Sequence, residues 1–497
     1  MTDHSKRIFG NPVSAAAYDK AKRSKESYIN KFGDDSDANY QLTLKKNDCL
    51  YDDFNLYNLC LSDNEGSEIN YDTKKGIIVG NIRMGFGHYR ISMAMASAAH
   101  DLGYTPYWFD LNSFPTTTAT KIISAQNELY SLGSRISQKN KLFNKVVWEP
   151  MNYDGFKHLS YNSSDQKNAE LMTPLFKSIP KDMPFIGTHV WPAQAAIHSG
   201  MKHVVNAIPD NWPMALHLAE GSIHTVQTHN AYYGYRTLNG FQGDHILKPM
   251  PHNSIYYTGH YIDAELVHGI ESDCDARIAR SKANAPVRFL LTIGGAGAQQ
   301  KLFTSIISYL IPAVKKHKAS LIINFGDHLN VLESIMEELP ELDEIATMHI
   351  NNWDESKSYT KKALESSSQP DHYDPEIEGL HVFAHDDIYE AVYSTNLLMR
   401  ACDVLVTKPS ELAFYPIPKL FIEHVGGHEK WGAIHSAEIG DGCPECSDIP
   451  HTLQMLSLFI RDRSLIEEMC QNIKKNKKLG IYDGAYKAVK LAFGESI

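Results

Sequence analysis

The sequence contains few cysteines, no long apolar run and no excess of positive charge. Seven cysteines in 497 residues, an odd number, fit reduced thiols better than a disulfide framework. No run of about 18 apolar residues occurs, and residues 1–35 contain no apolar segment of signal-peptide length, so we expect a cytoplasmic protein. The formal net charge of −11 argues against general nucleic-acid binding, which depends on basic surface. We therefore expect no nucleic-acid partner and only local phosphate sites.

Length and composition indicate an ordinary globular protein with more than one domain. A chain of 497 residues exceeds the usual size of one hydrophobic core. The apolar fraction of 43% and the charged fraction of 22% are those of a folded globular chain, and no short-period repeat occurs. These values favour two or three domains.

The only closely spaced cysteines are Cys443 and Cys446, in the stretch GDGCPEC. With His428, His435 or His451 nearby, they resemble half of a structural zinc site. No second Cys-x-x-Cys pair occurs, so a plain loop is the alternative that we favour. We expect no bound metal.

Two stretches of the chain begin with the pattern of a βαβ unit. The first, GIIVGNIRMGFGHYRISMAMASAAHDLGYTPYWFDL, predicts a strand, a glycine-rich turn, a helix and a second strand that ends at Asp110. Further strands are expected at 184–188 and 203–208. A second series begins at Val287 with VRFLLTIGGAGAQQKLF. Strands that alternate with helices predict an α/β fold with parallel sheets, each covered on both faces.

The two series predict two Rossmann-like domains. Shifts in composition place the boundaries. We expect an N-terminal extension over 1–75, a first Rossmann-like domain over 76–265, a charged linker over 266–285, a second Rossmann-like domain over 286–470 with a polar loop insertion at 351–378, and a C-terminal helix over 471–497.

The first glycine-rich turn carries a candidate base. Gly85 and Gly87 allow the backbone to approach a ligand closely, and His88 follows at the start of the helix. The helix dipole disfavours an imidazolium there, so a neutral His88 can act as a general base near neutral pH. A tight turn with a capping or packed histidine is the alternative.

The second glycine-rich turn is a candidate pyrophosphate site that needs no metal. It offers backbone N–H groups and a helix N-terminus at Gly294, Gly295 and Gly297. A dinucleotide-binding fold also presents backbone N–H groups and a helix N-terminus at such a turn. Such a fold has an acidic residue about 20 positions after the turn, whereas Asp327 lies about 30 positions after it.

Polar residues also follow two later strands, expected at 404–407 and 418–422. Carboxyl ends of parallel strands are where open α/β sheets bind ligands. A carboxylate there can accept both hydroxyls of a ribose, and a lysine can neutralise phosphate. Surface ion pairs are the alternative. The residues are Lys408, Ser410, Glu411, His428 and Glu429.

Together these motifs resemble a known family over about residues 76–442. GFGHYRIS, HVVNAIPDNWPMALHLAEGSIHTVQT, IYYTGHYID, TIGGAGA and the pair VTKPSE and GGHE resemble, in order, the conserved segments of one group of GT-B glycosyltransferases. The group includes monogalactosyldiacylglycerol synthase, processive diacylglycerol glucosyltransferases and the peptidoglycan N-acetylglucosaminyltransferase. The resemblance implies a GT-B fold, with two Rossmann-like domains facing across a cleft.

The resemblance also implies a reaction, an inverting transfer of a hexose or N-acetylhexosamine from a UDP-sugar donor to the hydroxyl of an acceptor, expected to be lipid-linked. No metal or other cofactor is implied. The first domain would bind the acceptor and the second the donor. The resemblance implies that His88 is the base and that Gly85, Gly87, His189 and Asp210 lie on the acceptor side. It implies that Gly294, Gly295 and Gly297 bind the pyrophosphate of the donor, that Glu411 binds its ribose, and that His428 and Glu429 bind its sugar. The backbone near Phe383 would contact the uracil, and Lys408 and Ser410 would make other donor contacts.

Departures from the family pattern leave the donor sugar open. His428 stands where glutamine is common, and the segment between Lys408 and Glu411 is shorter than usual. Two other functions remain open on the same architecture, a nucleotide-sugar 2-epimerase and a non-catalytic nucleotide-sugar-binding protein.

A basic amphipathic stretch over 120–148 is a candidate membrane-binding segment. Ile122, Leu129, Leu132 and Ile136 recur at helical spacing among five basic residues. Such a helix can lie in the interface of an anionic membrane. Packing of the same stripe on the first sheet is the alternative.

Overall fold

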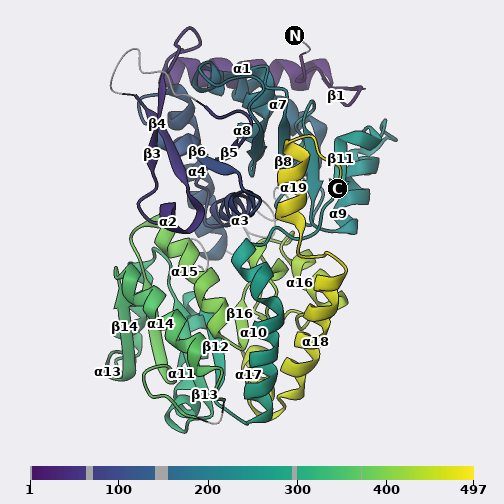
Figure 1. Cartoon of the computed structure of the whole chain (residues 1–497). Helices are drawn as coiled ribbons and strands as arrows, with labels where there is room; N and C mark the ends of the chain where they lie inside the picture. Colours follow the sequence, from purple (N-terminus) through teal and green to yellow (C-terminus); the bar gives the residue numbers. More distant parts are fainter. Residues whose placement is uncertain (1–2, 63–70, 140–154, 294–298, 371) are drawn as a thin grey trace. The chain divides into compact units, whose positions relative to one another are not determined.

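The computed structural model describes residues 3–62, 71–139, 155–293, 299–370 and 372–497 (Figure 1). The chain divides into two compact units. The first unit contains Met1–Ile262, Gly426–His428 and Asp483–Ile497, and the second contains Asp263–Val425 and Glu429–Tyr482. Each unit is built around its own sheet.

The first unit contains an eight-stranded sheet in the order β11-β9-β8-β7-β5-β6-β4-β3. Every pairing is parallel except that of β3 with β4. The chain runs from β5 to β6 on one side and then returns to β7 on the other, so the switch point lies between β5 and β7. The strands are β3 (Leu42–Lys46), β4 (Tyr57–Leu61), β5 (Gly76–Asn81), β6 (Thr105–Asp110), β7 (Phe185–Gly187), β8 (Val204–Ala207), β9 (Ile223–Val226) and β11 (Ile255–Tyr257).

Close packing at the centre of this sheet depends on glycine. All six residues of β5 are buried. A Cβ at Gly80 would lie 2.3 Å from the Phe185 ring on the neighbouring strand. The helices of the unit are α1 (Ala15–Phe32), α2 (Tyr51–Phe54), α3 (Gly87–Asp101), α4 (Thr118–Lys139), α7 (Leu159–Ala169), α8 (Val190–His198), α9 (His229–Thr237) and α19 (Gly484–Ala492). Figure 1 shows α19, in yellow, beside β8.

The second unit contains a six-stranded, fully parallel sheet in the order β14-β15-β13-β12-β16-β17. Its switch point lies between β12 and β16. The strands are β12 (Val287–Thr292), β13 (Ala319–Asn324), β14 (Ala346–Ile350), β15 (Leu380–Ala384), β16 (Val404–Thr407) and β17 (Lys419–Phe421). The helices are α10 (Ala264–Lys282), α11 (Gln300–Lys315), α12 (Leu329–Glu338), α13 (Glu341–Ile345), α14 (Trp353–Ser366), α15 (Ile388–Ala401), α16 (Lys430–Glu438), α17 (Ile449–Arg461) and α18 (Ser464–Lys478). The expected α/β class with two Rossmann-like domains is confirmed.

The segment expected as an N-terminal extension contributes structure to the first unit. Strands β3 and β4 form one end of the sheet, and α1 packs against α7. Composition hides these elements because they lie at the periphery. Only one residue of β4 is buried, Leu59, and α1 buries only Ala21.

Two other segments that the sequence suggests to be irregular are helical. The expected linker 266–285 lies largely within α10, and the second unit begins at Asp263. The expected loop insertion 351–378 contains α14, which connects the neighbouring strands β14 and β15. Over the C-terminal stretch 471–497 the structure has the end of α18 and then α19, which belongs to the first unit.

The candidate membrane segment is part of α4. Ile122 is buried in the core of the first unit, whereas Leu129 and Ile136 are exposed. Residues 140–148 lie outside the described residues. Within the described part of the chain, no helix combines the length and the apolar character that a membrane crossing needs.

Candidate functional site

Several predicted site residues lie at the carboxyl edge of the first sheet. We call this region the first-sheet edge: the loops that follow β5, β7 and β8, which are neighbours in the sheet. Gly85 has φ +73°, a conformation that favours glycine, and its turn leads into α3. His88 is the second residue of α3 and is half-buried. The fold thus places His88 beside the switch point, where α/β sheets bind ligands.

A backbone carbonyl fixes the tautomer of His88. Its Nδ1 lies 2.8 Å from the carbonyl oxygen of Thr188, the residue that follows β7. A carbonyl only accepts, so Nδ1 carries the proton and donates. The Thr188 N–H in turn donates to the carbonyl oxygen of Gly80 at 2.9 Å. A neutral His88 therefore holds its basic lone pair on Nε2, the atom that can accept a proton.

His189 is a second imidazole at the same place. Its ring centroid lies 4.8 Å from that of His88, in an edge-to-face arrangement at 86°. His189 caps α8, and its Nδ1 accepts the Trp191 backbone N–H at 3.2 Å. Burial holds the pKa of His189 well below its usual value, and the nearby His88 and His217 lower it further. A neutral ring that accepts at Nδ1 carries its proton on Nε2, so His189 is a hydrogen-bond donor.

Asp210, in the loop after β8, pairs with a histidine that the sequence does not single out. Its Oδ2 lies 2.9 Å from Nε2 of His217, which is buried. Burial alone would raise the pKa of the Asp210 carboxyl, but the hydrogen bond and charge of His217 hold it well below the usual value. The signal available in the sequence was the histidine seven positions after the aspartate.

A buried amide at the end of β5 was also missed. Asn81 is fully buried, and neither its Oδ1 nor its Nδ2 has a hydrogen-bond partner among the described residues. It stands opposite Asp110 in the pairing of β5 with β6. Burial raises the pKa of the Asp110 carboxyl, against the opposing effect of its hydrogen bond from the Tyr89 hydroxyl. No sequence pattern singles out this asparagine.

The second-sheet edge, the loops that follow β12, β16 and β17, holds most of the other predicted residues. The hydroxyls of Thr292 and Thr407 lie 2.8 Å apart and join the ends of β12 and β16 at the switch point. Gly294, Gly295 and Gly297 follow β12 and lie outside the described residues. Their role in pyrophosphate binding stays a prediction.

Lys408 and Glu429 form an ion pair that joins the loops after β16 and β17. The second carboxylate oxygen of Glu429 accepts the Val425 N–H at 2.9 Å. The sequence predicts a phosphate contact for Lys408 and a sugar contact for Glu429, and the fold brings these two side chains together. Ser410 and Glu411 are half-buried in the loop after β16, where Glu411 begins a short 3-10 helix.

His428 lies in the polar turn after β17, folded over a glycine. A Cβ at Gly426 would lie 2.8 Å from Cε1 of the His428 ring. The Nδ1 of His428 is buried and has no hydrogen-bond partner among the described residues. The sugar role implied for His428 stays a prediction.

Phe383 does not reach the strand end. It lies within β15, is fully buried, and stacks on the His349 ring with centroids 4.3 Å apart. Its carbonyl oxygen already accepts the Phe325 N–H at 2.9 Å. The uracil contact that the resemblance implies for the backbone near Phe383 stays a prediction.

The cysteine pair has the character of packed thiols. Burial raises the pKa of both Cys443 and Cys446 to about 11. A metal ligand is a thiolate, which a raised pKa disfavours. Over the described residues, no group of three or more His, Cys, Asp or Glu side chains is placed to hold a metal ion.

Comparison with known proteins assigns one family model to each half of the chain. Residues 7–237 match the model described as "Domain of unknown function (DUF6937)" and residues 250–493 match "Domain of unknown function (DUF6938)". No curated protein matches the chain. The two matched regions divide the chain between residues 237 and 250, close to the unit boundary after Ile262.

Several solved structures are distantly similar. The UDP-GlcNAc 2-epimerase from Neisseria meningitidis bound to UDP-GlcNAc is 11% identical, with a TM-score of 0.44 and coverage of 84% of this chain and 98% of that one. A glycosyltransferase from Rickettsia africae ESF-5 is 10% identical, with a TM-score of 0.40 and coverage of 86% and 100%. The α,α-trehalose 6-phosphate synthase from Burkholderia multivorans is 12% identical, with a TM-score of 0.39 and coverage of 84% and 98%. These distant likenesses assign no activity to this chain, whose fold rests on its own two sheets.

Proposed function

We propose that this protein is an inverting glycosyltransferase that moves a hexose or N-acetylhexosamine from a UDP-sugar to an acceptor hydroxyl. The observation that carries the proposal is the geometry of His88. The Thr188 carbonyl oxygen fixes its tautomer, so Nε2 can take the proton of a hydroxyl at the carboxyl edge of the first sheet. His189 adds a neutral donor for the oxygen of that hydroxyl.

The second unit would bind the donor. Its switch point, between β12 and β16, is where an open α/β sheet takes a nucleotide. The glycine-rich sequence after β12 would offer backbone N–H groups to the pyrophosphate, and these would stabilise the leaving diphosphate as its charge develops. Glu411 would accept the ribose hydroxyls. Lys408 would reach phosphate by exchanging its carboxylate partner, Glu429, for the donor.

The acceptor is proposed to be lipid-linked, and the protein peripheral to the inner face of an anionic membrane. The supporting observation is α4, whose exposed Leu129 and Ile136 lie on a helix that also carries basic residues. UDP-sugars and lipid-linked acceptors would meet on the cytoplasmic side. We propose that the transfer reaction needs no metal ion.

The test is release of UDP from a panel of UDP-sugars, with and without lipid extract. His88→Ala should lower transfer about 100- to 10,000-fold, as expected for a lost general base, while UDP affinity in calorimetry stays near the wild-type value. Glu411→Ala should weaken UDP binding with little effect on the fold. Full transfer by His88→Ala would remove the base from the mechanism, and unchanged UDP affinity in Glu411→Ala would remove the ribose contact.

A nucleotide-sugar 2-epimerase is the second candidate. It is favoured by the second titratable pair at the first-sheet edge, Asp210 with His217, because epimerisation needs proton transfer groups directed at the donor sugar itself. An epimerase exchanges a sugar proton with solvent when no acceptor is present. Incubation in deuterium oxide followed by mass spectrometry of the UDP-sugar distinguishes the two, since only the epimerase incorporates deuterium into the sugar.

A further inference from the structure

A pair of buried hydroxyl groups joins α3 to the end of β7. Ser92 lies one turn after His88 in α3, Thr188 follows β7, and both side chains are fully buried. Their hydroxyl oxygens lie 2.7 Å apart, the usual length of a hydrogen bond between two hydroxyl groups. The same Thr188 provides the carbonyl oxygen that accepts the Nδ1 proton of His88. The pair is therefore placed to control where the His88 ring lies.

The start of α3 lacks a side-chain cap. Phe86, in the N-cap position, forms no side-chain hydrogen bond with the first turn. Gly85 has φ +73° and Gly87 is the first helical residue, so the turn before His88 contains residues of wide conformational freedom. The first N–H groups of a helix have no partner within the helix, and helix ends fray. A contact from another element is therefore needed to fix the position of His88, the second residue of this helix.

The direction of the hydrogen bonds follows from the acceptors within reach. Thr188 Oγ1 lies 3.3 Å from the His88 carbonyl oxygen and 3.4 Å from that of Gly80, so the Thr188 hydroxyl has two acceptors for its proton. The Ser92 hydroxyl then donates to Thr188 Oγ1. Thr188 thus contacts His88 at two points, the ring through the Thr188 carbonyl oxygen and the main chain through the Thr188 hydroxyl.

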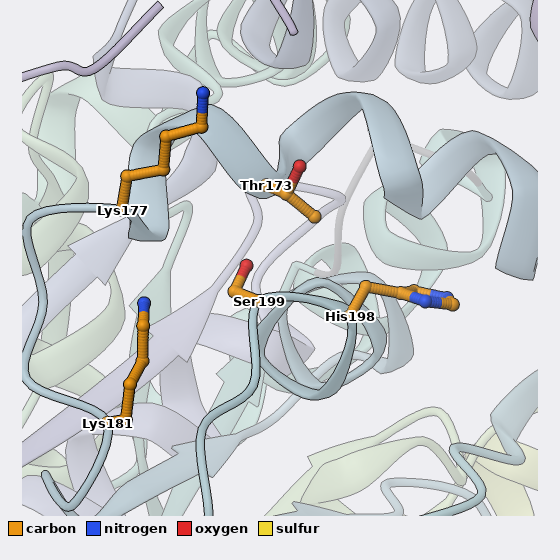
Figure 2. A pocket seen from close by; sticks show the side chains of 5 residues that line it. All are labelled: Thr173, Lys177, Lys181, His198 and Ser199. Carbon is orange, nitrogen blue, oxygen red and sulfur yellow. The ribbon is translucent and has the colours of Figure 1, made fainter. Parts of the chain in front are cut away.

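Two other hydroxyl groups of the first unit behave differently. Ser199 and Thr173, which line the pocket in Figure 2, donate to carbonyl oxygens four and three residues before them, at 2.7 and 2.8 Å. Such local bonds are common for serine and threonine in helices. Ser92 has the same option, since the carbonyl oxygen of His88 lies four residues before it, yet its hydroxyl bonds to Thr188. A bond between two elements fixes their relative position, whereas a local bond does not.

We propose that the hydroxyls of Ser92 and Thr188 form a positioning pair for His88. The pair holds the uncapped first turn of α3 on the end of β7 and keeps the Nδ1–H of His88 on the Thr188 carbonyl oxygen, so that Nε2 keeps its lone pair for the acceptor hydroxyl. Both side chains are fully buried, so they act through His88 and not on the substrate. The inference rests on the proposed function only where it takes His88 as the base.

The first experiment measures the tautomer of His88 in the full-length protein by NMR of its imidazole nitrogens, with His88→Gln to assign the signals. In the wild type we expect the proton on Nδ1. Thr188→Val removes the hydroxyl but keeps the backbone carbonyl, and Ser92→Ala removes the group that donates to this hydroxyl. Each should lower the ratio of the Nδ1–H to the Nε2–H tautomer about two- to tenfold, because a hydrogen bond contributes about 0.5–1.5 kcal/mol. Thr188→Ser keeps the hydroxyl and should keep the wild-type ratio.

The second experiment measures transfer. Ser92→Ala and Thr188→Val should lower kcat by a similar factor, while KM for the donor and the affinity for UDP stay near their wild-type values, because the pair acts on the base alone. Thr225→Val is the matched control. It removes a buried hydroxyl of similar geometry, 2.8 Å from the Tyr261 hydroxyl, from within β9. Its melting temperature should fall by about as much as that of Thr188→Val, with no change in the His88 tautomer or in kcat.

Two results would overturn the inference. One is a wild-type tautomer ratio in both Ser92→Ala and Thr188→Val, which, with only a lower melting temperature, would mean that the pair merely satisfies two buried polar groups. The other is a loss of the wild-type ratio in Thr188→Ser as large as in Thr188→Val, which would assign the effect to packing and not to the hydroxyl. Absence of transfer by the wild type with every donor would contradict the proposed function instead, and the NMR measurement would still test the pair.

Discussion

Removal of Arg288 should destabilise the second unit by leaving a buried carboxylate undercompensated. The Arg288 guanidinium, 2% exposed, donates to Glu378 at 2.7 and 3.0 Å, and Glu378 is also 2% exposed. Arg280 bridges Glu378 and Asp403, at 3.1 and 3.3 Å, so two cations neutralise two anions. In Arg288→Met one negative charge loses its compensation. Breaking a buried pair on one side typically costs about 3–5 kcal/mol.

A double variant distinguishes the effect of the uncompensated charge from the effect of altered packing. In Arg288→Met with Glu378→Met, both charges leave together and the pair of Arg280 with Asp403 remains. Replacement of a buried ion pair by apolar residues is often neutral or stabilising. The double variant should therefore recover most of the loss. Hydrogen exchange of β12, followed in urea, is the assay, because it reports the second unit alone in a chain of two units.

The pH dependence gives a further check. Burial would raise the pKa of Glu378, but Arg288 and Arg280 hold it below its usual value. A depressed folded pKa stabilises the fold above the unfolded pKa of 4.5, and this contribution is lost as the pH falls through the folded pKa. The deficit of Arg288→Met should therefore be largest near pH 7 and shrink as the pH falls through the lowered pKa of Glu378, where the carboxylate becomes protonated. A loss under about 1 kcal/mol, or a double variant no better than the single one, would refute the reasoning.

Three other predictions concern separate parts of the chain. Gly484→Ala should lower the melting temperature of the first unit, since its Cβ would lie 2.1 Å from the Gly259 carbonyl oxygen and overpacking costs about 1–3 kcal/mol; an unchanged melt would contradict the close approach. Transfer should survive EDTA, because the proposed pyrophosphate site consists of backbone N–H groups and needs no metal; loss of activity with rescue by manganese would contradict it. Wild-type protein should co-sediment with anionic vesicles at low salt, and Leu129→Glu should reduce this while Ile246→Glu, at an exposed position elsewhere, should not; equal sedimentation of all three would exclude α4 from the contact.

The sequence predicts best those elements that obey a hydrophobic period. Strand β16 occupies Val404–Thr407, as its apolar run indicates, and β5, α3 and β6 follow the pattern of the first βαβ unit. Fully buried parallel strands produce continuous apolar runs that composition reveals directly. The edges where ligands bind follow from these strands, so the candidate positions of His88 and Glu411 could be found before the structure.

The helices that the sequence misses are those that bury charged or polar side chains. The charges of α10 suggested a solvated linker, yet Arg277 and Arg280 are buried in it. Arg277 donates to the carbonyl oxygens of Cys402 and Met399, both at 2.8 Å. In α14 the buried face consists of Ser356, Tyr359, Thr360 and Ala363, which a hydrophobic period does not detect. Partners that compensate a buried polar group lie far away in sequence, so only the fold reveals them.

The same limit applies to the candidate site. The sequence identifies His88 and Asp210, but the atoms that decide their chemistry belong to other segments. The Thr188 carbonyl, 100 positions from His88, sets its tautomer, and His217 sets the charge of Asp210. Likewise, the pairing of Lys408 with Glu429 depends on the adjacency of β16 and β17. Residue type therefore predicts which groups take part, while topology determines their protonation and partners.

Hydrogen bonds of threonine residues join the strand ends at the switch point of each sheet. Thr188 ties the end of β7 to β5 through Gly80, at 2.9 Å, and the hydroxyls of Thr292 and Thr407 tie β12 to β16. The strand ends at each switch point are thus joined by buried residues, Thr188 in the first sheet and Thr292 and Thr407 in the second. The groups with proposed chemical roles, His88 and Glu411 among them, lie on the turns and first helical residues beyond these ties. Substitutions in the turns can change the substrate while the tied strands keep the edge rigid, so the choice of donor sugar and acceptor should depend on the loops after β5, β8, β16 and β17.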